Sequence, residues 1–136
     1  MMKTQTAVEQ DFYDAISKTQ LAEMVSGEIY KSRIRPLNST AEDIVIISTA
    51  LNASQLQEGV VTILIYTQGI KRDSNLLPDL ERISQIEEMV LTLPSELKQL
   101  LPEYDGIRLA TAISYALDES VWQYFVSCKI NYKFLT

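Results

Sequence analysis

Hydrophobic and polar residues alternate without interruption near the end of the chain, from Val121 to Phe134. A repeat of two is the period of a β-strand with one buried face. The inward row of this strand would consist of Trp122, Tyr124, Val126, Cys128, Ile130, Tyr132 and Phe134. Because the strand is about twice the usual length, a neighbouring strand, charge or another subunit must cover its polar row and any unpaired edge. The pattern therefore favours a protein that assembles with other subunits over a protein that catalyses a reaction.

Further segments have strand character, from period-two alternation or from β-branched residues. They are Glu28–Arg35, Asp43–Ala50, Val60–Thr67 and Ile107–Leu117. Pro36 ends the first of them. The second and third are predicted to form an antiparallel hairpin, with Asn52–Glu58 as a polar loop between them. Gly69–Asn75 reads as a connector and Asp105-Gly106 as a turn. We expect Ile107–Leu117 to pair with the last strand as a second hairpin.

Two segments have the apolar spacing of amphipathic helices. Ala7–Val25 forms one helix with a break near Thr19. A second helix starts after Pro78, where proline is tolerated, and carries one apolar stripe over Leu80–Leu93. Pro94 is predicted to end it, and Ser95–Leu101 adds at most one short turn.

The resulting element order is α-β-β-β-α-β-β. It predicts an α+β fold, a mostly antiparallel sheet of about five strands with two main helices packed on it. The 136 residues suffice for one domain with one core. Apolar runs are too short to span a bilayer and the first residues lack the apolar stretch of a signal peptide, so a cytosolic chain is expected.

Composition argues against several function classes. The net charge of −6 disfavours a general nucleic-acid coat. The chain has no histidine, the commonest general base and metal ligand. It also has no glycine-rich phosphate loop and no nucleophile elbow. We therefore expect no enzyme activity, no metal and no cofactor. The single cysteine, Cys128, is interpreted as a small buried hydrophobe.

Three cations alternate along the first predicted strand, at Lys31, Arg33 and Arg35. On one strand face they would lie about 7 Å apart. Three interpretations are open for this row: a solvated face, phosphate binding such as DNA passing through a pore, and pairing with acids of the second helix on another subunit. The full set of candidate contact residues is Lys31, Arg33, Arg35, Gln55, Gln57, Glu58, Glu81, Glu87 and Glu88.

Several segments together resemble the tail-terminator and tail-completion proteins of tailed bacteriophages. They are Val25–Tyr30 with Arg35-Pro36, Ala41–Ile47, Glu58–Tyr66 and the helix Leu80–Leu93. Gly27–Tyr30 and Arg35-Pro36 match the family pattern as they stand, whereas Asn52–Gln57 does not align with it. The resemblance covers nearly the whole chain in element order.

The resemblance implies a structural subunit of a phage or prophage particle. Its copies would form a ring, possibly a hexamer, that terminates the tail tube and joins it to the head connector. Such a subunit would occur in the bacterial cytoplasm during assembly and then in the virion. The alternative is a cytosolic binding module that recognises a protein through a sheet edge or the Asn52–Glu58 loop.

Overall fold

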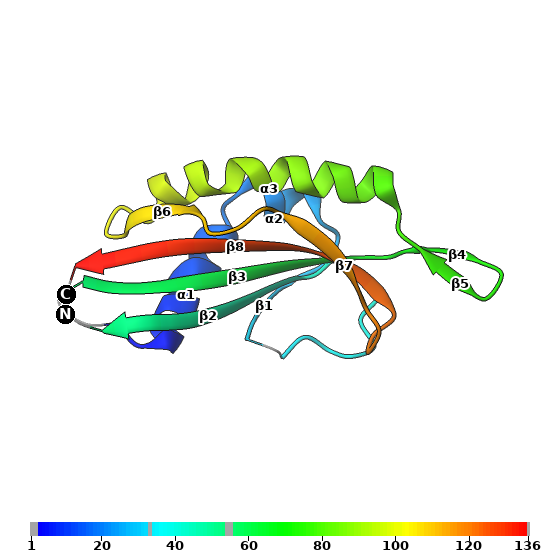
Figure 1. Ribbon diagram of the computed structural model, residues 1–136, viewed down its shortest axis with the longest axis horizontal. Helices are drawn as coiled ribbons and strands as arrows, with labels where there is room; N and C mark the ends of the chain where they lie inside the picture. Colours follow the sequence, from blue (N-terminus) through cyan, green and yellow to red (C-terminus); the bar gives the residue numbers. More distant parts are fainter. Residues whose placement is uncertain (1–2, 33, 54–55, 136) are drawn as a thin grey trace.

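The computed structural model describes residues 3–32, 34–53 and 56–135. A six-stranded sheet forms the centre of the molecule, and a separate two-stranded sheet projects from one end (Figure 1). Helices and sheet share one buried apolar cluster. The predicted α+β class is confirmed, with mostly antiparallel pairing in the sheet.

The large sheet contains β1 (Ile29–Lys31), β2 (Ile44–Ala53), β3 (Leu56–Thr67), β6 (Asp105–Leu109), β7 (Ser114–Asp118) and β8 (Gln123–Leu135). Its order is β1-β2-β3-β8-β6, and β7 also pairs with β8. The β1–β2 pair is parallel and every other pair in this sheet is antiparallel. The long last strand is therefore internal, because β3 covers one of its edges and β6 and β7 cover the other.

The inward row predicted for the last strand is largely confirmed. Val126, Cys128, Ile130 and Tyr132 are buried in the core. Burial raises the pKa of the Cys128 thiol to about 12. Trp122 was wrongly placed in this row: β8 begins one residue later, and Trp122 is exposed with a φ of 56°. A positive φ takes a residue out of the extended conformation, so the strand pattern cannot extend back to Trp122.

The predicted strand Ile107–Leu117 pairs with β8 as expected, but it is divided into β6 and β7. The predicted turn at Asp105-Gly106 instead begins β6. Gly106 has a φ of 63°, and the register shifts between Asp105 and Arg108. Glycine adopts a positive φ without steric cost, so the backbone can bulge here while the ladder continues.

The predicted polar loop Asn52–Glu58 is wrong, because β2 and β3 extend into it. The register pairs Asn52 with Glu58 and Ala53 with Gln57, and it shifts between Ala50 and Asn52. Ladder hydrogen bonds, with β8 pairing on the far side of β3, satisfy the backbone of these polar residues. Polar composition alone therefore misidentified two strand ends as a loop.

Three helices occur in the described chain: α1 (Gln5–Ile16), α2 (Gln20–Met24) and α3 (Leu80–Leu100). The predicted break near Thr19 is confirmed. The Thr4 side chain caps α1 by accepting a hydrogen bond from the Ala7 N–H. Asp79 caps α3 in the same way by accepting from the Arg82 N–H. No helix in the described ranges has the length and apolar character needed to cross a bilayer.

Pro94 does not end α3, which was a wrong prediction. An internal proline removes one helical hydrogen bond and costs about 3 kcal/mol. Leu93 and Leu97 are fully buried on the same stripe as Ile86 and Val90. Burying each large apolar side chain contributes about 1.5–3 kcal/mol, so burial of the last two turns offsets the cost of the proline.

Gly59 allows the two longest strands to pack at the core. It lies opposite Tyr132, and a Cβ on Gly59 would come within 2.6 Å of ring carbon Cε2 of Tyr132. We expect Gly59→Ala to lower the free energy of unfolding by about 1–3 kcal/mol through overpacking. Thr62→Ala, on the other face of β3, should cost about 0.5 kcal/mol or less. Equal losses for both variants in equilibrium denaturation would contradict this packing.

Candidate protein interface

The predicted row of cations is not a row in the structure. β1 ends at Lys31, and Ser32 has a φ of 53°, so alternation along an extended strand stops there. Lys31 Nζ donates a hydrogen bond to Gln10 Oε1. Arg35 is buried within its own chain, and Arg33 lies outside the described residues. The shared basic strand face that the sequence suggested is therefore wrong.

Arg35 instead holds the segment before β2 against the end of the sheet. Its Nε atom donates to Asp43 Oδ2 at 2.8 Å, and a terminal nitrogen donates to Gln123 Oε1 at 2.7 Å. The same terminal nitrogen also donates to backbone carbonyls of Ser39 and Ala41. The guanidinium carbon lies 4.1 Å from the centroid of the Tyr66 ring. Arg35 is thus a structural anchor for residues 35–43.

Tyr66 connects this anchor to the turn before β8. Its hydroxyl donates a hydrogen bond to Asp118 Oδ2 at 2.9 Å. Burial opposes ionisation of Asp118, but hydrogen bonds from Ser120 and Tyr66 hold its pKa below the usual range. The anchor therefore fixes two surface segments, residues 35–43 and the β7–β8 turn, next to each other.

Beside these two segments a hairpin projects from the body. It consists of β4 (Ile70–Arg72) and β5 (Asn75–Leu77), and we call it the arm. Figure 1 shows the arm extending away from the sheet, at the end opposite both termini. The predicted connector Gly69–Asn75 is therefore partly strand. An isolated two-stranded hairpin is marginally stable in water, so an arm of this kind gains from a partner surface.

The two faces of the arm differ. Ile70 pairs directly with Leu77, and Arg72 with Asn75, which places these four side chains on one face. The other face carries Leu76, which is buried, and Lys71, which lines a cavity against the body. The face with Ile70, Arg72 and Leu77 therefore points away from the body.

Large apolar side chains are exposed on several separate segments at this end of the molecule. We call this set the arm end: Leu37, Ile70, Leu77, Leu80 and Trp122. A cavity of about 270 Å³ between the arm and the body is lined in part by Leu37, Leu76 and Trp122. Exposed apolar side chains, and exposed tryptophan in particular, are enriched at protein interfaces.

Trp122 is the most unusual residue of the arm end. It is 48% exposed and has a positive φ, which is uncommon for a large side chain. Trp122 is the last residue of the turn between β7 and β8, and a left-handed residue at the end of a hairpin turn lets the chain enter the next strand. Its neighbour Gln123, held by Arg35, fixes the backbone that presents the Trp122 ring.

The remaining predicted contact residues differ in their burial and in their hydrogen bonds. Gln57 is buried and exchanges two hydrogen bonds with the backbone of Lys3, so it serves the fold. Glu58 is half-buried in β3. Gln55 lies outside the described residues. Glu81 and Glu88 are exposed on α3, and Glu87 is half-buried there. Among the contact residues predicted from the sequence, the three acids of α3 are thus accessible to a partner.

The sequence interpretation missed the arm. The sequence contains only a short indication of this hairpin. Asp73-Ser74 forms a turn between two three-residue strands, and the apolar residues Ile70 and Leu77 lie at equal distances on either side of the turn. Strands of three residues are too short for period-two alternation to be distinguished from a loop.

Among the described residues, no three side chains of histidine, cysteine, aspartate or glutamate gather as metal ligands would. A scan against protein-family models found no match. A search of curated proteins found no significant match either.

Proposed function

We propose that this chain is a structural subunit of a phage or prophage particle, whose copies form a ring that terminates the tail tube and joins it to the head connector. The observation that carries the proposal is the arm end. It presents five large exposed apolar residues, Trp122 among them, on a projecting hairpin, two anchored surface segments and the first residue of α3. The family resemblance of the sequence supports the same function. No catalytic residue is assigned.

The alternative is a binding module that recognises one protein partner. The arm end fits this function as well, because an apolar projection can dock on a partner other than a second copy. The Asn52–Glu58 loop no longer supports the alternative, since those of its residues that the structure describes belong to β2 and β3. The ring proposal and the binding-module alternative differ in what the protein binds.

Trp122→Ser tests the proposal. Exposed tryptophans at the centre of an interface contribute about 2 kcal/mol or more to binding. We expect the variant to keep its circular dichroism spectrum and to lose ring formation and the capping of tail tubes. Light scattering at several protein and salt concentrations measures the first, and electron microscopy of tubes mixed with the protein measures the second.

Leu91→Ser is the matched control, because Leu91 is 60% exposed on α3 and does not belong to the arm end. It should leave both activities unchanged. A wild-type protein that stays monomeric at every concentration and does not bind tubes of its own phage would refute the ring function. The binding-module alternative would then take its place.

A further inference from the structure

A groove between α2 and α3 is lined by apolar and acidic side chains that match the apolar and basic side chains on the outward face of the arm. Its volume is about 430 Å³, and it is lined by Gln20, Met24, Arg82, Gln85, Glu88, Met89 and Thr92. Met24 and Met89 are partly buried and form its apolar part. Methionine side chains are flexible and polarisable, so they adapt to an incoming apolar group.

The charge available in the groove is negative. Arg82 is already neutralised, since its Nε and a terminal nitrogen donate to Glu42 at 2.7 and 2.6 Å. This ion pair holds the pKa of Glu42 below its usual range, chiefly through the hydrogen bond from Arg82. The Glu88 side chain is exposed, and its carboxylate makes no hydrogen bond or ion pair with another described residue. Glu88 is therefore the free charge of the groove.

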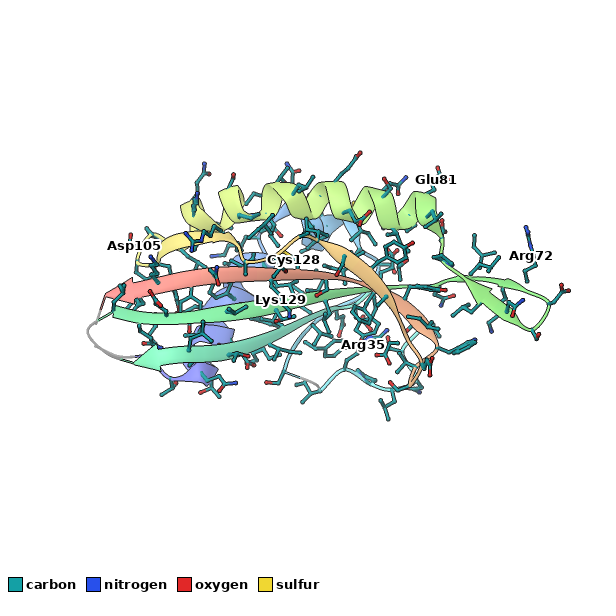
Figure 2. All side chains as sticks on the ribbon, in the orientation of Figure 1. Arg35, Arg72, Glu81, Asp105, Cys128 and Lys129 are labelled. Carbon is teal, nitrogen blue, oxygen red and sulfur yellow. The ribbon has the colours of Figure 1, made fainter. Side chains whose placement is uncertain are left out.

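The arm offers the matching chemistry. Ile70 and Leu77 form an apolar pair, and Arg72 follows on the same face nearer the tip. Arg72 makes no hydrogen bond or ion pair through its side chain within the described chain. Figure 2 shows Arg72 near the outer end of the arm, with its side chain extending sideways from the hairpin. An arginine can bind a carboxylate through two parallel hydrogen bonds.

We propose that the arm of one copy docks in the α2–α3 groove of the next copy, with Ile70 and Leu77 on Met24 and Met89 and with Arg72 paired to Glu88. This proposal rests on the proposed ring function and specifies one of the contacts between copies, separate from the surface that carries Trp122. The arm projects from the end of the molecule, whereas the groove lies along the helices. A contact between two different surfaces is heterologous, and repeated contacts of this kind close into a ring when the rotation permits.

A charge-reversal pair tests the ion pair. Arg72→Glu and Glu88→Lys should each weaken self-association about five- to tenfold, because reversal replaces attraction by repulsion. The double variant should recover most of the loss. Glu87→Lys is the matched control: successive helix residues lie about 100° apart, so Glu87 points to the other side of α3. Sedimentation velocity at low salt provides the measurement, since salt screens such pairs.

Thiol cross-linking tests the placement directly. A protein carrying Asn75→Cys on the arm and Thr92→Cys in the groove should give a ladder of linked copies with a short bismaleimide. A protein carrying Asn75→Cys and Lys98→Cys, on the opposite side of α3, should not. The native Cys128 does not interfere, because it is buried and its thiol has a pKa of about 12.

The results of these two experiments can contradict the arm–groove contact without contradicting the proposed ring function. Oligomers without an arm–groove ladder, or a double charge reversal that does not recover association, would overturn the inference and leave the ring function standing. A chain that never self-associates overturns the inference as well. The ring function is then decided by whether the protein caps tail tubes.

Discussion

Asp43→Ala should lower the free energy of unfolding by about 3–5 kcal/mol, because it leaves the guanidinium of Arg35 buried without its carboxylate. The side chains of Asp43 and Arg35 are 2% and 6% exposed. Asp43 also accepts a hydrogen bond from the Glu28 N–H at 2.9 Å, so its loss frees a second donor. Equilibrium denaturation with urea measures the change.

The control for Asp43→Ala is Glu42→Ala, which removes the neighbouring and more exposed pair with Arg82. Water can solvate the arginine left behind there, so the loss should be clearly smaller. If the two variants lose the same free energy of unfolding, burial of the Arg35–Asp43 pair has no energetic consequence. The anchoring role assigned to Arg35 would then be wrong.

Phe12→Ala should destabilise the protein to a similar degree, by about 3–5 kcal/mol. Phe12 is fully buried and joins α1 to the sheet. Its ring lies edge-on to Tyr104, with 5.5 Å between centroids, and 6.0 Å from the ring of Tyr132. Removing it leaves a cavity and breaks both aromatic contacts, which add to the loss of apolar burial.

Tyr13→Ala is the control for Phe12→Ala. Tyr13 is the next residue of α1, is only partly buried, and lies under the Lys31 ammonium. It should cost less than half as much. Thermal and chemical denaturation of both variants provide the comparison. A loss below about 1 kcal/mol for Phe12→Ala would place α1 outside the cooperative core.

The sequence by itself determined the elements that have a long, regular pattern. The alternation from Val121 to Phe134 located the core strand β8, the apolar stripe after Leu80 located α3, and the break near Thr19 separated α1 from α2. The hairpins β2–β3 and β7–β8 followed from strand spacing. These features are local, because side-chain periodicity reports which face of an element is buried.

Only the tertiary structure decided what the individual charged and apolar side chains do. Arg35 looked like one of three surface cations, yet it is held by Asp43 and by Gln123, which is 88 positions away in the chain. Pro94 was predicted to end α3, yet burial of Leu97 stabilises the helix beyond the proline. The arm looked like a connector, and its exposed apolar face is visible only against the rest of the fold. In each case the outcome depends on partners distant in sequence, whose burial and hydrogen bonds outweigh the local preference.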